Sequence, residues 1–303
     1  MSSKSTATIL LLVSVLIASM LCIFTRNLTK LGFSPFDIVF VRLFFGVLAL
    51  FVIIMVTSRG SLKIEKKDIL LLIFFGVSKF LMDYTFVTSL EVINVSLSVL
   101  LQNTAPYFVV IVSYFLLKEK VSKMTMLSII MGTVGCVLMA GKTLLYTELD
   151  PMGIIFALLS SFFLAMFYIG SDRSEKKGYS AATYLFYVLL VAAIVTIPFA
   201  DMGTIFGNIA DLNILFHYLV LGIVMTLMPF YIMAWSVRYL DSVAVSVICV
   251  MEVLFAAIVG VFYFDEVLDI LDAIGIVMMI ASIVLISKIS GTKGSEDTGQ
   301  QQS

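Results

Sequence analysis

Charged residues are scarce in this chain of 303 residues. Lys, Arg, Asp and Glu together make up 13% of it, whereas a soluble domain has about 25%. Hydrophobic residues make up 61% and the mean hydropathy is +1.13. So little charge cannot cover a surface that faces water on all sides, which excludes an ordinary soluble domain. The composition is typical of an integral membrane protein.

Residues that build metal sites, disulfides and catalytic centres are also few. The chain has one histidine, His217, and three cysteines, Cys22, Cys136 and Cys249, each inside an apolar run. No metal-ligand spacing, disulfide framework, phosphate-binding glycine loop or Ser/His/Asp set is present in the sequence. We therefore expect no enzyme activity, no cofactor, no metal and no nucleic acid partner. Any transport would be secondary, because no nucleotide-binding segment exists to supply ATP drive.

Long apolar segments make up most of the sequence. A helix needs about 20 apolar residues to cross a bilayer, and backbone amides cannot go unpaired in hydrocarbon. The sequence therefore predicts an all-α polytopic membrane protein with ten transmembrane helices. Their approximate bounds are 7–29, 36–57, 69–88, 93–116, 123–141, 152–170, 180–199, 214–234, 242–263 and 268–287.

Basic residues orient this bundle. If the N-terminus lies inside, 14 of the 19 lysines and arginines fall near inner helix ends. Three fall outside, at Arg26, Lys30 and Lys142, and two lie within helices, at Arg42 and Lys79. Cytoplasmic loops of membrane proteins carry such an excess of positive charge. Both termini are therefore predicted to be cytoplasmic.

One long segment of the chain recurs about 147 residues later. The first copy is Leu90–Val121 and the second is Val237–Leu268. Both are apolar runs with polar residues or a proline at mid-depth, and both end in charged residues. The flanks change from basic at 118–120 to acidic at 264–266. Because five is an odd number, a second copy of five helices must insert upside down, and the charge rule then requires this change of sign.

The recurrence predicts two inverted five-helix repeats, residues 1–145 and 146–290, followed by a disordered cytoplasmic tail at 291–303. In the fifth helix of each repeat, two small residues lie seven positions apart, which allows close packing of two helices. They are Ser128 and Gly135 in the first repeat and Gly275 and Ser282 in the second. Inverted repeats are typical of secondary transporters, whose binding site lies near the midplane at the repeat interface.

Several motifs match a known family. They are Ser34-Pro35 with Arg42, Asn103-Thr104-Ala105-Pro106 followed by Lys118-Glu119-Lys120, and Glu266 with Gly275. Over nearly its whole length the chain resembles the EamA-type branch of the drug/metabolite transporter superfamily. The second half matches less well, since Val253 stands where the first half has a proline. The resemblance implies a ten-helix carrier for amino acids, metabolites or drugs, without indicating which.

Two ionisable residues of the third predicted helix stand four positions apart. Lys79 and Asp83 therefore share a helix face, with Tyr84 adjacent. Ionisable groups inside a membrane are costly and usually face a cavity or each other. Lys79 could meet the carboxylate of a zwitterionic solute and Asp83 its amine. Alternatively, the two form a structural ion pair that holds the bundle together.

Glu252 lies near mid-depth in the ninth predicted helix and has no charged partner in that helix. An isolated carboxylate at this depth is a candidate for proton coupling or for binding a substrate amine. One alternative is that it pairs with Arg42 or Lys79 across the bundle and only holds helices together. Another is that it stays permanently protonated and hydrogen-bonded.

Two further candidates are Arg42 and Asn103. Arg42 matches the arginine of the family's second helix and could bind an anionic group, but it lies close enough to the outer interface to reach it and serve structure instead. Asn103 stands beside a backbone carbonyl that Pro106 disturbs, and together they could form a neutral ligand group. Ordinary hydrogen bonding between helices is the other interpretation of Asn103.

These observations predict a secondary-active transporter that works by alternating access in the membrane of a prokaryotic cell. We expect it to export small metabolites such as amino acids, amines or drug-like solutes, with proton coupling as one option. A non-transporting membrane subunit or sensor is the alternative from another class. The test between them is whether neutralising Glu252, Lys79 and Asp83 affects function while folding stays intact.

Overall fold

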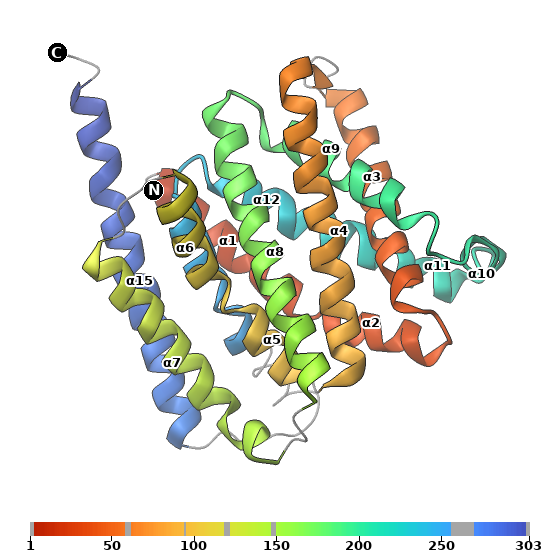
Figure 1. Cartoon of the computed structure of the whole chain (residues 1–303), viewed down its shortest axis with the longest axis horizontal. Coiled ribbons are helices and arrows are strands. Elements are labelled where there is room, and N and C mark those ends of the chain that lie inside the picture. Colours follow the sequence, from red (N-terminus) through yellow and green to blue (C-terminus); the bar gives the residue numbers. More distant parts are fainter. Residues whose placement is uncertain are drawn as a thin grey trace.

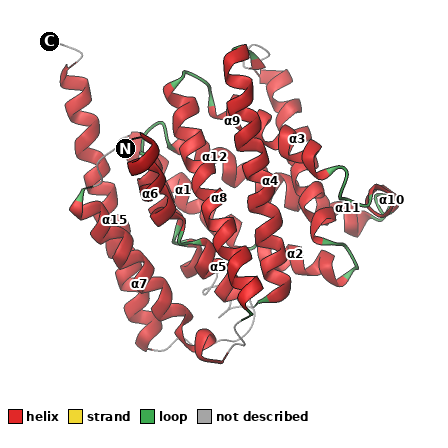
Figure 2. Cartoon of the chain, in the orientation of Figure 1, coloured by secondary structure: helices red, strands yellow, loops and turns green. Residues whose placement is uncertain are grey.

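The structure is a computed structural model that describes residues 3–57, 62–93, 95–117, 122–146, 150–255 and 270–300. Every regular element within these ranges is a helix, and turns and loops connect the helices (Figures 1 and 2). The charged segments 118–120 and 264–266 that flank the two copies lie outside the described residues, as do residues 301–303.

The residues that the structure describes form sixteen helical elements. In the first half they are α1 (Ser3–Ser19), α2 (Leu21–Lys30), α3 (Pro35–Thr57), the 3₁₀ turn η2 (Lys66–Asp68), α4 (Ile69–Val92), α5 (Val95–Gln102), α6 (Ala105–Leu117) and α7 (Lys123–Tyr146). In the second half they are α8 (Pro151–Lys176), α9 (Ala181–Thr196), α10 (Met202–Gly207), α11 (Leu212–Leu219), the π-helix η3 (Val220–Leu227), α12 (Met228–Ser236), α13 (Ser242–Cys249) and α15 (Ile270–Gln300).

Within the described residues, six helical segments are long and apolar enough to cross a bilayer. They are Lys4–Lys30, Pro35–Thr57, Lys66–Val92, Leu97–Phe115, Pro151–Lys176 and Leu212–Ser236. Four shorter apolar helices accompany them: Lys123–Leu138, Ala181–Thr196, Ser242–Phe255 and Ala273–Ile286. Each falls within or overlaps one of the ten predicted spans. The chain is thus a polytopic membrane protein, and ten crossings stay a prediction.

Two expected boundaries differ from the observed ones. The first predicted helix is interrupted at Met20, between α1 and α2. At the other end, α15 continues to Gln300, so it runs through most of the segment for which the sequence predicts disorder.

Matching turns end α2 and α8. Gly32 and Gly178 both have positive φ angles, of 91° and 85°, a conformation that glycine adopts without steric cost. In each turn the glycine N–H bonds to a carbonyl three residues back, and the following N–H bonds to one five residues back, as in a Schellman cap. The two turns occupy corresponding positions in the two halves of the chain.

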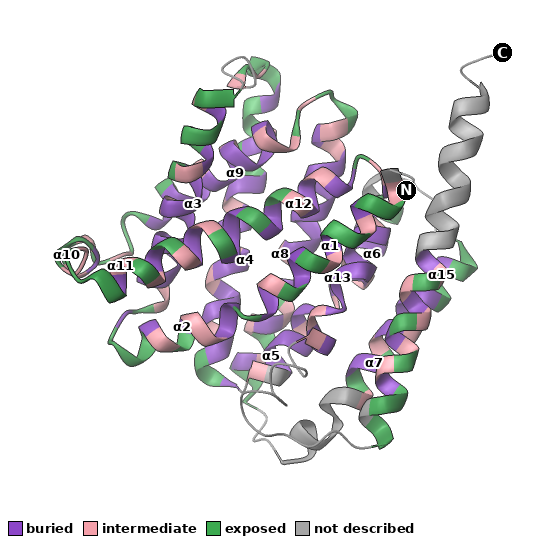
Figure 3. Cartoon of the chain, turned by 180° about the vertical axis from the view of Figure 1, so that it is seen from behind, coloured by how far each residue is buried: buried purple, intermediate pink, exposed green. Residues whose placement is uncertain are grey.

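Helices α7 and α15 pack side by side along one edge of the bundle (Figures 1 and 3). The hydroxyls of Ser128 and Ser282 donate to each other's backbone carbonyls at 2.8 and 2.7 Å. Further along the contact, Gly135 lies against Gly275, where a Cβ on Gly135 would come within 2.7 Å of the Gly275 carbonyl oxygen. The small residues seven apart in the sequence therefore meet in crossed pairs, as a two-fold relation between the helices requires.

Replacing Gly135 with alanine is expected to separate α7 from α15 and lower the free energy of unfolding by about 1–3 kcal/mol. The added methyl group would also meet Met279, with its Cγ at 2.7 Å and its backbone nitrogen at 3.2 Å. Thermal unfolding of the purified protein in detergent measures the effect. Gly207→Ala serves as the control, because a Cβ at Gly207 meets nothing within 4 Å. Equal melting temperatures for the two variants would contradict this account.

Candidate functional site

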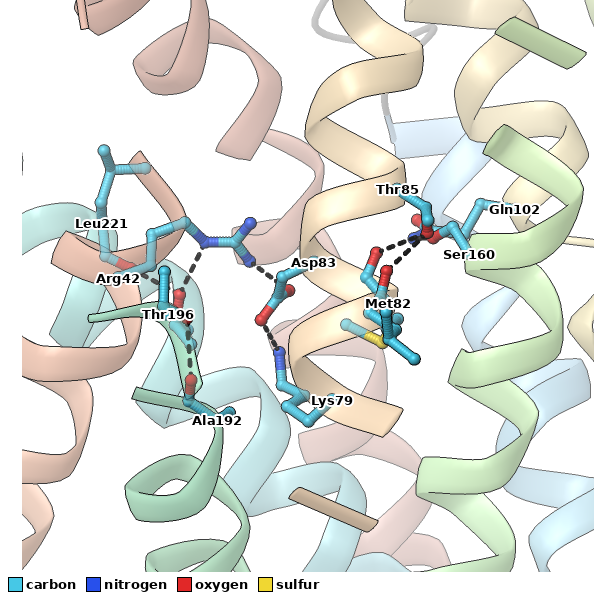
Figure 4. A network of polar contacts seen from close by, with 12 residues as sticks. Arg42, Lys79, Met82, Asp83, Thr85, Gln102, Ser160, Ala192, Thr196 and Leu221 are labelled. Atoms are coloured by element: carbon cyan, nitrogen blue, oxygen red, sulfur yellow. Dashed lines mark hydrogen bonds and ion pairs between the residues drawn. The ribbon is translucent and has the colours of Figure 1, made fainter. Parts of the chain in front are cut away.

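Three charged side chains meet in the interior of the bundle (Figure 4). Arg42 on α3 and Lys79 and Asp83 on α4 are at most 1% exposed. Asp83 lies between the two cations: its Oδ2 is 2.5 Å from Lys79 Nζ, and its Oδ1 is 3.3 Å from Arg42 Nη2. The i,i+4 pair expected from the sequence is therefore present, and Arg42 extends it to a triad.

Arg42 points into the bundle. The alternative that its side chain reaches the outer interface is therefore not observed. Its Nε donates to Thr226 Oγ1 at 3.1 Å, and Thr226 Oγ1 in turn donates to Leu221 O at 2.7 Å. Both acceptors belong to the π-helix η3. A π-turn of this kind is rare and frequent at functional sites. Here it places the Thr226 hydroxyl where a buried guanidinium needs an acceptor.

Lys79 has an aromatic neighbour as well. Its Nζ lies 3.8 Å from the ring centroid of Phe230 on α12, within the range of a cation–π contact. The cluster is thus enclosed by α3 and α4 from the first half of the chain and by η3 and α12 from the second.

The triad does not balance its own charge. Two cations face one carboxylate, which leaves one excess positive charge in the bundle interior. Arg42 Nη1 is also buried and makes no hydrogen bond in the part of the chain that the structure describes. An unsatisfied buried donor on a charged group is costly. The site therefore has unused capacity to bind an anionic group.

The cluster brings together residues that lie at the interval of 147 positions seen in the sequence. Thr226 follows Lys79 by 147 residues, and Phe230 follows Asp83 by the same interval. Sequence reasoning missed Thr226 and Phe230, although the repeat interval points to them. Lys79 and Asp83 lie on the α-helix α4, whereas Thr226 belongs to the π-helix η3 and Phe230 to α12. Neither the charge nor the helix type of the first copy is therefore fully repeated at these positions.

Each of the two long recurring segments contains a break in its helix near the middle, and the two breaks lie at matching positions. Helix α5 ends at Gln102 and α6 starts at Ala105; α13 ends at Cys249 and helix resumes at Glu252, so both boundaries recur after 147 residues. The sequence led us to expect a disturbance only beside Pro106. The second interruption, with Val253 in place of that proline, shows that proline is not required for it.

Asn103 and Glu252 stand at these two interruptions and are neighbours. The Asn103 amide Nδ2 donates to Val99 O at 2.9 Å, and the same side chain is within hydrogen-bonding range of the Glu252 carboxylate. Glu252 is half-buried and makes no ion pair within 4.0 Å among the described residues. The expected alternative of a direct pair with Arg42 or Lys79 is therefore not observed. Arg42 nevertheless lies close enough to act on Glu252 through its charge.

Side chains on α8 hold the first interruption in place. Gln102 Nε2 donates to Ser160 Oγ at 2.7 Å, and the Thr104 and Ser161 hydroxyls are 2.9 Å apart. The backbone of the interrupted segment is thereby anchored to the second half of the chain. Ser160 and Ser161 gave no signal in the sequence beyond being adjacent polar residues in an apolar run.

Tyr84 takes part in an aromatic stack and not in the ion cluster. Its ring lies 4.3 Å from that of Phe36 at an interplanar angle of 12°, and Phe80 and Phe199 extend the stack. The stack covers the α4 face next to Lys79 and Asp83. Tyr84 was a candidate because it is adjacent to Asp83 in the sequence, and the contacts that the structure gives it are aromatic.

Apolar helices surround a buried ion cluster whose charge is not fully neutralised, and two of the helices are interrupted. These features define a polytopic membrane protein with polar groups in its interior. Such groups in membrane proteins mark solute or ion paths. The chain belongs to the EamA-like transporter family, whose sequence profile matches residues 5–141 and again 151–288. The protein is therefore a membrane transporter by family, and the resemblance stated from its motifs is confirmed.

Proteins of similar sequence are also named as transporters. An uncharacterized transporter of Archaeoglobus fulgidus is 28% identical over 275 residues, which cover 91% of this chain and 94% of that protein. An S-adenosylmethionine uptake transporter of Rickettsia prowazekii is 25% identical, with 83% and 82% covered. A solved crystal structure superposes with a TM-score of 0.73 over 95% of this chain and 99% of the other at 16% identity. That similarity shows a shared fold over nearly the whole length.

Proposed function

We propose that this protein is a secondary-active exporter of small metabolites in the cytoplasmic membrane of a prokaryotic cell. Transport proceeds by alternating access between two inverted five-helix repeats, residues 1–145 and 146–290, with both termini in the cytoplasm. The observation that carries the proposal is the Arg42–Lys79–Asp83 cluster, which is buried between the two halves and keeps an excess positive charge.

The repeat contacts support the alternating-access part. Equivalent helix boundaries and small residues recur after 147 residues and the equivalent turns after 146. The crossed Ser128–Ser282 and Gly135–Gly275 contacts are those that a two-fold relation between the halves would produce. Inverted halves of this kind can exchange conformations, which opens the site to one side and then to the other.

The charges support a solute that carries both a carboxylate and an amine. Arg42 Nη1 offers unused donors for a carboxylate, and hydrogen bonds between a guanidinium and a carboxylate are charge-assisted and strong. The half-buried Glu252 offers a carboxylate for an amine or for a proton. S-adenosylmethionine, named for one relative, contains an amino acid group of this type. Amino acids and their derivatives are accordingly the first solutes to test.

Uptake through the same path is the second candidate function, because the rickettsial relative is named as an uptake transporter. A carrier without ATP drive moves solute in the direction that the gradients set. In the proposed cycle Glu252 binds either a proton or the substrate amine, so that an inward proton gradient would drive solute outward.

The wild-type protein in proteoliposomes is expected to move solute without ATP. Radiolabelled amino acids, amines and S-adenosylmethionine are supplied on one side while a pH gradient is imposed, and flux is compared with that of empty liposomes. Saturable flux that collapses on addition of a protonophore is the expected result. Its dependence on the sign of the gradient separates export from uptake.

Thermal stability in the presence of the same solutes gives an independent readout. A solute present at 100 times its Kd is expected to stabilise the native protein by about 2.7 kcal/mol. A solute that binds without flux would favour a sensor over a carrier. Neither binding nor flux with any member of the three solute classes would contradict the proposed substrate class.

A further inference from the structure

A groove lies between the start of α4 and the end of α8, which run side by side (Figure 1). It has a volume of about 680 Å³. Four basic side chains line it: Lys67, Arg173, Lys176 and Lys177. Its remaining wall is apolar and comes from α4: Leu70, Leu71 and Phe74.

The groove is polar at one end and apolar along its length. Leu70 and Phe74 are four residues apart, so they share one face of α4, and Lys67 precedes them in η2. Leu70 is 77% exposed and Phe74 is 53% exposed, which in a bilayer means exposed to acyl chains. At the end of α8, Lys176 and the C-cap residue Lys177 follow Arg173 by three and four residues. Lys177 pairs with Asp68, the residue directly before α4.

Three of the four basic side chains form ion pairs with acidic residues. Lys67 pairs with Glu65 at 2.6 Å, Lys176 with Asp172 at 2.8 Å, and Lys177 with Asp68. In both of the last two pairs the acid is more buried than the lysine. Asp68 is 4% exposed and its partner Lys177 is 42% exposed. Asp172 is 11% exposed and its partner Lys176 is 59% exposed. The basic ends therefore face the groove.

Arg173 is different. It lies in the last turn of α8 and lines the groove, and it forms no ion pair with any residue that the structure describes. Interactions with the helix C-terminus explain basic residues in a last turn in general, but they leave the guanidinium fork open. Four cations and three acidic partners leave one positive charge for a ligand to neutralise.

We propose that this groove binds an anionic phospholipid. The phosphodiester carries one negative charge and accepts the Arg173 fork, with Lys176 and Lys177 at its sides, while an acyl chain follows Leu70 and Phe74. Basic pockets between transmembrane helices at the cytoplasmic surface bind anionic head groups in this way. The lipid would join α4 of the first half to α8 of the second. The proposal does not depend on what the protein transports.

Native mass spectrometry of the full-length protein tests this site. The probes are phosphatidylglycerol and phosphatidylcholine with identical acyl chains, added in equal amounts to the detergent-purified protein. Wild type is expected to retain phosphatidylglycerol in preference, and Arg173→Gln to weaken that retention about fivefold. Arg173→Lys, which keeps the charge, should lose less. Lys66→Gln is the matched control, because Lys66 is an exposed lysine beside the groove that does not line it.

Two further arms separate the sources of the phosphate group. A large excess of inorganic phosphate should leave bound phosphatidylglycerol in place, and Phe74→Ser should weaken both lipids because it removes apolar wall. Displacement by inorganic phosphate would overturn the lipid site in favour of a free-anion site. Equal retention of the two lipids by wild type, or equal losses in Arg173→Gln and Lys66→Gln, would overturn the groove as a specific site.

Discussion

Replacing Asp83 with asparagine is expected to lower the free energy of unfolding by about 3–5 kcal/mol, because removal of one partner leaves the others as uncompensated buried charges. Arg42 and Lys79 would then face each other at 1% and 0% exposure with no carboxylate between them. Asparagine keeps the size of the side chain, so lost packing cannot explain the effect. Yield of monodisperse protein and thermal unfolding in detergent measure it.

A second variant distinguishes a triad from a pair. Lys79→Met leaves a neutral Arg42–Asp83 pair and places a methionine against Phe230, a favourable contact for a thioether. It should therefore be much less damaging than Asp83→Asn. The double variant Lys79→Met/Asp83→Asn should remain clearly less stable than Lys79→Met alone, because Arg42 still lacks a counter-charge. If Lys79 and Asp83 formed an isolated pair, the double variant would recover to the level of the single, and the triad would be refuted.

Glu252→Gln is expected to lower solute flux about 30-fold or more and to remove its dependence on the pH gradient. The side chain keeps its size and can still hydrogen-bond to Asn103, but it can neither carry charge nor exchange a proton. Loss of one charged partner in a buried contact costs about 2–5 kcal/mol of binding, which corresponds to this factor. Flux into proteoliposomes at several imposed gradients measures both effects.

Glu91→Gln is the matched control, because Glu91 is an exposed carboxylate at the end of α4. Its flux and gradient dependence should equal those of wild type. Flux through Glu252→Gln that persists but ignores the gradient would assign Glu252 to coupling alone. Wild-type flux and wild-type pH dependence in Glu252→Gln would remove this residue from the mechanism.

Much of the architecture follows from the sequence alone, because it depends on local chemistry. Apolar runs must become helices in hydrocarbon, and Asp150 and Ser180 mark helix starts by accepting hydrogen bonds from the first-turn N–H groups. The i,i+4 spacing of Lys79 and Asp83 brings them together on any helix. The interval of about 147 residues was also visible in the sequence. The spacing of seven between small residues predicted that they would share one face of α7 and one face of α15.

The site itself was only partly predictable, because it depends on how helices far apart in the chain rotate and cross. Spacing gives the depth of Arg42 but not its direction, and only the packing of α3 against η3 turns it toward Thr226 and Asp83. Tyr84 follows Asp83 by one residue, yet a rotation of 100° about the helix axis places it in an aromatic stack. The interruption before Glu252 has no proline to announce it.

The sequence by itself therefore determined the helices, their recurrence in two halves and the Lys79–Asp83 pair, since these follow from composition and short-range geometry. Only the tertiary structure decided that Arg42 joins that pair, that Thr226 and Phe230 complete it, and that Asn103 meets Glu252. Each of those contacts joins segments that are distant in sequence. Their free energy depends on burial and on the partner that packing supplies, and no local pattern encodes either.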